Sequence, residues 1–123
     1  MSIFSPSEIK YLQSQRLGRL ATVGANGQPH VVPVAFRYNP GLDTIDIGGH
    51  DFAKRNKFRD VHTNPNVVIV VDDIASFNPW KVRGVEIRGE VEVLLTGGTE
   101  LLPGFTPEMF RLHPKRVISW GVN

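Results

Sequence analysis

Apolar residues recur at every second position in several segments, and this period of two predicts a protein built mainly from β-strands. Val67 to Val71 (VVIVV) is the most strand-prone segment and is expected at the centre of the sheet. Residues 82–95 carry valine and isoleucine at the same period and predict one long strand that bends at Gly89. Four shorter strands are expected over residues 19–23, 30–37, 44–47 and 115–122.

Capping and turn residues separate these strands. Ser5-Pro6-Ser7-Glu8 has the form of a capping box, so it predicts a helix that ends near Arg16. Asn26-Gly27 favours a tight hairpin between the first two strands, because both residues tolerate a positive φ. Thr106-Pro107 can begin a second short helix before the last strand.

The second strand contains an unexpected proline. Residues 30–37 are mostly apolar, which predicts a strand buried on both faces. Proline cannot donate a hydrogen bond to a neighbouring strand. Pro33 is therefore expected to face a sheet edge, a bulge or a ligand.

The six strands and few helices predict a small antiparallel β-barrel. A chain of 123 residues is long enough for one hydrophobic core, so residues 1–123 are expected to form a single domain. The composition, 41% hydrophobic and 21% charged, is that of a globular protein and argues against disorder.

Composition and motifs exclude several classes of function. The chain has no cysteine, and its four histidines lack ligand spacing, so no metal site is expected. The net charge of +2 and the absence of an interleaved aromatic and basic stripe argue against nucleic acid. No apolar run approaches membrane-spanning length and no secretory signal is recognisable, so the cytoplasm is the expected location. No nucleophile motif or P-loop identifies a catalytic residue.

The basic character is concentrated between Asp51 and Pro65. Asp51 is expected as the N-cap of a helix that Pro65 ends, and the segment carries four cations within six positions: Lys54, Arg55, Lys57 and Arg59. A basic helix beside a sheet can receive a phosphate, although a solvated basic surface is the alternative. At 100° per residue the four cations do not share one face, so only some of them can bind one phosphate.

Two further side chains, His50 and Trp80, each have more than one interpretation. His50 lies at the expected junction of strand and helix beside the basic segment, where it is either a turn residue or a ligand contact. Trp80 follows Asn78-Pro79 in a loop and can serve as a core residue, a stacking surface or an interface contact.

Four stretches together resemble the pyridoxamine 5′-phosphate oxidase-like split β-barrel family, in particular the branch that uses the deazaflavin coenzyme F420: residues 18–36, 57–71, 82–93 and 111–121. The resemblance implies a split, Greek-key-like antiparallel barrel. It also implies that Lys57 and Arg55 hold the cofactor phosphate. Asp60-Val61 departs from the usual Asn-Leu, so Asp60 is expected to turn away from the phosphate or to pair with Arg59.

The same resemblance implies further contacts to the cofactor. The strand segment Val32, Pro33 and Val34 is expected to line the flavin or deazaflavin ring. His50 and Asn56 are expected to make nearby polar contacts, and Trp80 to form part of the site wall.

The function implied is that of an F420-dependent oxidoreductase, which transfers a hydride between reduced deazaflavin and a small unsaturated organic substrate. Family resemblance also implies a homodimer with cofactor sites at the subunit interface. FMN in place of F420 is the alternative cofactor, and a non-catalytic flavin, F420 or haem-type binding or storage protein is the alternative class. No general acid stands out, which leaves water as the source of the substrate proton.

Overall fold

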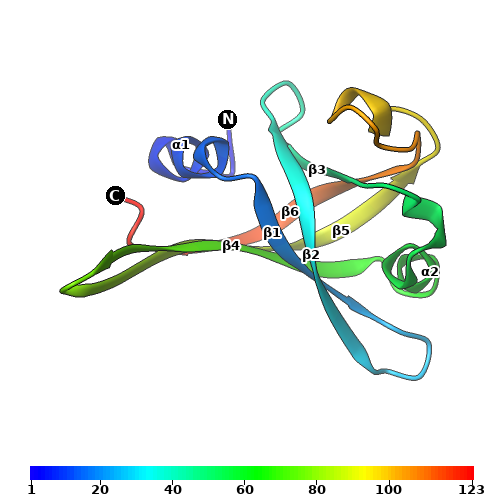
Figure 1. Cartoon of the computed structure of the whole chain (residues 1–123), viewed down its shortest axis with the longest axis horizontal. Coiled ribbons are helices and arrows are strands. Elements are labelled where there is room, and N and C mark those ends of the chain that lie inside the picture. Colours follow the sequence, from blue (N-terminus) through cyan, green and yellow to red (C-terminus); the bar gives the residue numbers. More distant parts are fainter.

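Six strands form a closed antiparallel barrel in the computed structural model, which describes all 123 residues (Figure 1). Around the barrel the order is β1-β2-β3-β6-β5-β4, so the neighbours β3–β6 and β4–β1 are not consecutive in sequence. The predicted Greek-key-like β-barrel is thus confirmed. The elements are α1 (Pro6–Ser14), β1 (Leu17–Val23), β2 (Pro29–Asn39), β3 (Thr44–Gly48), the 3₁₀ turn η1 (Phe52–Lys54), α2 (Asn56–Thr63), β4 (Asn66–Phe77), β5 (Trp80–Leu94), the 3₁₀ turn η2 (Gly98–Glu100) and β6 (Met109–Trp120).

The core fills the inside of the barrel with alternate residues from its strands. In β4, for example, Val67, Ile69 and Val71 are buried while the residues between them are partly exposed. This alternation confirms β4 as a strand. Its predicted central position is wrong, because a closed ring has no centre and β4 simply lies between β1 and β5.

Local signals in the sequence produce the expected local structures. The N–H of Glu8 donates to Ser5 Oγ at 3.2 Å, and the N–H of Ser5 donates to Glu8 Oε1 at 2.8 Å, so the capping box is confirmed. The helix ends at Ser14, two residues before the predicted end. In the first hairpin Gly27 adopts φ +83°, as the Asn26-Gly27 turn requires.

Gly89 marks an irregularity in β5, as predicted. The strand is continuous, but its pairing with β6 shifts register between Arg88 and Gly89. A Cβ atom at Gly89 would lie only 2.2 Å from the carbonyl oxygen of His113. The close approach of the two backbones therefore requires glycine here.

The expected helix at Thr106-Pro107 is wrong. Thr106 instead joins the loop before β6 to the loop before η1: its Oγ1 accepts from the N–H of Phe52 at 3.1 Å and donates to the carbonyl oxygen of Gly49 at 3.1 Å. These long-range bonds hold Thr106 outside any helix, and the short turn η2 occurs earlier, at Gly98–Glu100.

The basic segment is also not the single helix expected from the sequence. Arg55 is extended (φ −84°, ψ 151°) and separates η1 from α2. Asp51 adopts a left-handed conformation (φ 48°) before η1 and makes no side-chain cap, so its assignment as N-cap of a basic helix is wrong. The angle of 100° per residue therefore does not describe how Lys54 and Lys57 are oriented relative to each other, because they do not belong to one helix.

The outer half of β2 is an open edge. Strand β3 pairs only with Ala35 to Asn39, so residues 29–34 pair with β1 on one side alone. The predicted burial of this strand on both faces is wrong for the single chain, where Val31 is 66% exposed. The edge position predicted for Pro33 is confirmed, since it lies in the half that β3 does not reach.

Two hairpins project from the barrel (Figure 1). The β4–β5 hairpin extends to the left in this view, and the β1–β2 hairpin extends below α2. Neither helix of the structure has the length and apolar character needed to cross a membrane.

Candidate cofactor site

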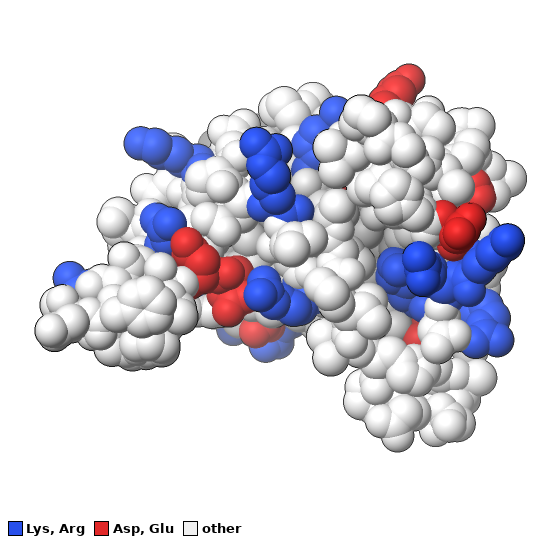
Figure 2. Space-filling model, in the orientation of Figure 1, with Lys and Arg blue, Asp and Glu red and all other residues white.

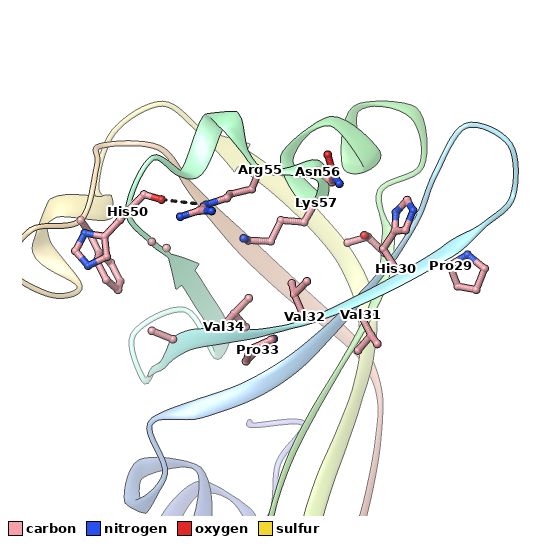
Figure 3. Close-up of a pocket in the computed structure, with 15 residues that line it drawn as sticks. Pro29, His30, Val31, Val32, Pro33, Val34, His50, Arg55, Asn56 and Lys57 are labelled. Carbon is pink, nitrogen blue, oxygen red and sulfur yellow. Dashed lines mark hydrogen bonds between the residues drawn. The ribbon is translucent and has the colours of Figure 1, made fainter.

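A cleft of about 750 Å³ lies between the outer half of β2 and the segment from Gly48 to Lys57 (Figure 3). Its size is within the usual range for cofactor and ligand sites. The cleft is lined by Thr22, Pro29, His30, Val31, Val32, Pro33, Val34, Ala35, Gly48, Gly49, His50, Arg55, Asn56, Lys57 and Phe105.

Lys57 points into this cleft from the first turn of α2 (Figure 3). The side chain is half-buried, and its Nζ lies 5.1 Å from the centre of the Phe52 ring, which supports it from below. Burial, and then the neighbouring charge of Arg55, lower the pKa of Lys57 from its ordinary value. The opposite charge of a bound anion would favour the protonated form and so offset both effects.

Arg55 lies beside Lys57 because its extended backbone precedes α2 directly. Its Nε donates to the carbonyl oxygen of His50 at 3.3 Å, which leaves the rest of the guanidinium open to the cleft (Figure 3). Neither Arg55 nor Lys57 forms an ion pair with a carboxylate. Two neighbouring cations without a carboxylate partner give this part of the cleft a positive charge that suits an anionic group.

The N-terminus of α2 adds backbone donors to the same place. No side chain caps the helix, and the N–H of Phe58 donates to the carbonyl oxygen of Arg55 at 3.0 Å, so the N–H groups of Asn56 and Lys57 are the first-turn donors without a capping partner. Asn56 itself accepts a hydrogen bond from Arg59. Figure 2 shows cations gathered over this region, but Lys54 and Arg59 do not line the cleft.

The opposite wall is the open edge of β2. The pleat of the strand directs Val32 and Val34 toward Lys57, while Val31 and Pro33 point to the other face (Figure 3). Pro33 therefore borders the cleft with its backbone rather than its ring. The apolar side chains of this wall suit a flat, hydrophobic ligand ring.

His50 and Trp80 lie in different places. His50 lines the end of the cleft, where its Nδ1 donates to the carbonyl oxygen of Gly104 at 2.7 Å and its ring packs edge-on against Phe105. Trp80 lies at the tip of the β4–β5 hairpin, is 62% exposed and does not line this chain's cleft. The structure thus gathers seven of the eight predicted site residues and leaves Trp80 apart.

Reasoning from the sequence missed a hydrogen-bonded group at the other end of the cleft. Asp60 of α2 is buried; its Oδ2 accepts from Thr22 Oγ1 at 2.8 Å and lies 2.7 Å from His30 Nδ1. Burial alone would raise the pKa of Asp60, but the hydrogen bonds from His30 and Thr22 hold it below its ordinary value. Asp60 thus bonds to Thr22 and His30 rather than to the cations that line the cleft, and the alternative of a pair with Arg59 is wrong. No local motif could have identified contacts between residues 30 and 38 positions apart.

The titratable groups do not form a metal site. No cluster of three or more histidine or carboxylate side chains lies close enough together to hold an ion.

Comparison with known proteins gives the family. The family model of pyridoxamine 5′-phosphate oxidase matches residues 6–119. A 5a,11a-dehydrotetracycline/5a,11a-dehydrooxytetracycline reductase of Streptomyces rimosus is 47% identical over 119 residues, which cover 97% of this chain and 84% of the reductase.

Solved structures share the fold at low sequence identity. HupZ of Group A Streptococcus is similar with a TM-score of 0.75 and 19% identity, and the match covers 94% of both chains. A FAD-binding protein of Mycobacterium smegmatis has a TM-score of 0.69 and 19% identity, with 98% of this chain and 97% of that protein covered. These similarities support the barrel topology.

The chain belongs to the pyridoxamine 5′-phosphate oxidase family, as the sequence resemblance implied. Its identity to the Streptomyces reductase places it, within that family, among the oxidoreductases.

Proposed function

We propose that this oxidoreductase binds coenzyme F420 in the cleft and uses the reduced deazaflavin to reduce a carbon–carbon double bond in a small unsaturated substrate. The observation that carries the proposal is the pair Arg55 and Lys57, two cations without a carboxylate partner at an uncapped helix N-terminus. Guanidinium, ammonium and backbone N–H donors gathered in one place suit a phosphate group.

Different residues of the cleft would contact different parts of such a cofactor. Lys57, Arg55 and the first N–H groups of α2 would hold the phosphate, with Asn56 and His50 near it. Val32 and Val34 would lie against the ring. When bound, the reduced deazaflavin supplies the hydride; the protein supplies binding, orientation and the exclusion of water.

The nature of the relatives supports a ring cofactor and a reductive reaction. The Streptomyces relative is named as a reductase of dehydrotetracyclines, and one protein of the same fold is named as FAD-binding. F420 is favoured over FMN because residues 57–71 and 18–36 resemble the F420-using branch. The cytoplasm, where a reduced cofactor is regenerated, is the proposed location.

A second copy of the chain is proposed to complete the site. The open edge of β2 leaves Val31 and Val32 exposed, and the tip of the β4–β5 hairpin exposes Phe77 and Trp80. These two apolar surfaces would be covered together if the hairpin of one protomer reached the cleft of the other, which would bring Trp80 to the site wall. Sedimentation of the wild-type protein should then show a dimer, and replacement of Trp80 by serine should weaken both the dimer and cofactor binding.

Titration of the purified protein with F420, FMN, FAD and haem tests the proposal. The expected result is saturable binding of F420 at micromolar concentration or below, with weaker binding of the other three, followed by oxidation of reduced F420 when a dehydrotetracycline is added. If the protein bound only FMN tightly, FMN rather than F420 would be its cofactor. Binding of none of the four would refute the proposed function.

A further inference from the structure

Two histidines line the cleft at opposite ends, and each uses its Nδ1 in a hydrogen bond. The partner of His50 is a neutral backbone carbonyl, whereas the partner of His30 is the buried carboxylate of Asp60. Either acceptor fixes the orientation of the ring, but a carboxylate places a full negative charge beside it, whereas a carbonyl offers only a dipole. The two histidines therefore have different chemical capacities.

Asp60 is well suited to hold His30 in one orientation. Thr22 Oγ1 donates to the same carboxylate oxygen, and Asp60 is buried, so the carboxylate cannot rotate freely to another partner. With Nδ1 directed at Asp60, Nε2 is the remaining nitrogen of the His30 ring and has no protein partner. His30 lines the cleft and its side chain is 41% exposed, so the ring is open both to a ligand in the cleft and to solvent.

We propose that His30 is the proton donor of the reduction and that Asp60, assisted by Thr22, is its positioning residue. This assignment rests on the proposed function. As the hydride from the reduced cofactor forms a C–H bond at one alkene carbon, the π electrons of the double bond move toward the other carbon or a conjugated carbonyl oxygen. The Nε2–H bond of His30 breaks, and its proton forms the second new bond. The substrate gains two electrons and two hydrogens, the cofactor is oxidised, and His30 takes a new proton from solvent.

The charged groups around His30 are compatible with proton donation and reprotonation at this residue. The elements packed against it bring the carboxylate of Asp60 and the cations Arg55, Lys57 and Arg59, all from α2 or the residue before it. The cations would be neutralised in part by the cofactor phosphate, and Asp60 would then stabilise the imidazolium before proton transfer. The alternative role of His30 is purely mechanical, as a clamp that ties the β1–β2 hairpin to α2.

Replacement of His30 by asparagine separates the two roles. The amide nitrogen of asparagine lies close to the position of Nδ1 and can keep the hydrogen bond to Asp60, but the variant has no Nε2. Asp60→Asn keeps the shape of the positioning residue and removes its charge. His113→Gln is the matched control, because His113 pairs with Glu92 on β5, outside the cleft.

For each variant the experiment measures F420 affinity, the steady-state kcat and KM, and the single-turnover rate of reduction of a dehydrotetracycline. For His30→Asn we expect unchanged F420 affinity, a rate of reduction lower by about 10²–10⁴-fold, and partial recovery of that rate with added imidazole. Asp60→Asn should lower kcat with little change in KM, and His113→Gln should behave as wild type. In D₂O the wild type should place deuterium on one face of the product, and His30→Asn should lose this selectivity.

Each outcome decides the assignment. A His30→Asn protein that reduces substrate at the wild-type rate would overturn the role of His30 while leaving the proposed function intact. If the rate of reduction and the F420 affinity of His30→Asn fell together and imidazole restored neither, His30 would have only the mechanical role of tying the β1–β2 hairpin to α2. If His30→Asn does not fold, the KM-against-kcat result for Asp60→Asn decides instead. Failure of the wild type itself to bind any cofactor would refute the proposed function and this inference with it.

Discussion

Replacement of Lys57 by alanine removes the ammonium group that faces β2 across the cleft. Lys57 is half-buried, supported by Phe52 and without a carboxylate partner, so little in the cofactor-free protein depends on its charge. The effect should therefore be seen in binding rather than in folding. Loss of one charge-assisted hydrogen bond is expected to cost about 1.5–3 kcal/mol. This corresponds to a dissociation constant for F420 that is roughly 10- to 150-fold higher.

The control is Lys54→Ala, which removes the same charge from η1, two positions before α2 begins. Lys54 is exposed and does not line the cleft, so its contribution should stay below about 1 kcal/mol and should decrease with added salt. Titrations of both variants at low and high salt separate direct contact from general attraction. Equal dissociation constants for Lys57→Ala and the wild type would show that another cation holds the phosphate.

The pH dependence of binding adds an independent check. The pKa of Lys57 is lowered in the free protein, chiefly by burial, and a bound phosphate would favour the protonated form. Affinity is therefore expected to be full at neutral pH and to fall as pH rises through the lowered pKa. The alanine variant should lack this decrease, and a decrease of the same size in Lys57→Ala would contradict the role of Lys57.

Two further predictions concern stability. The pKa of Asp60 is held below its ordinary value, so its carboxylate should contribute fully to the free energy of unfolding above about pH 4. This contribution should disappear as pH falls through the folded-state pKa. The free energy of unfolding, measured as a function of pH, should show this loss in the wild type and not in Asp60→Asn. Gly89→Ala should destabilise the barrel by more than about 3 kcal/mol, because its Cβ would lie 2.2 Å from a backbone oxygen. Gly41→Ala, where the nearest atom would be 3.5 Å away, is the control. Urea unfolding that shows similar stability for the two glycine variants would contradict the argument.

The features predicted correctly from the sequence are those set by neighbouring residues. The capping box at Ser5, the hairpin at Gly27 and the strand alternation around Ile69 depend on contacts within a few positions. The failures have long-range causes. Thr106 is kept out of a helix by bonds to residues more than fifty positions away, and Arg55 is extended between η1 and α2.

The residues of the candidate site also divide into those indicated by a local sequence motif and those brought together only by the fold. Arg55 and Lys57 could be selected from the sequence because the family motif lies within one short segment. The group formed by Thr22, His30 and Asp60 could not be, since it exists only after β1, β2 and α2 have come together. Trp80 lies at the exposed tip of the β4–β5 hairpin, apart from the cleft, and no local motif in the sequence indicates where that hairpin projects.

The proline in β2 also affects how the molecule behaves at high concentration. An apolar strand with one side unpaired is a ready template for strands from other molecules, and this is a common route to aggregation. Pro33 lies in the unpaired half and lacks the N–H group that a continuous ladder would need. The side chains of this edge thus stay open, while its backbone resists growth into an extended intermolecular sheet.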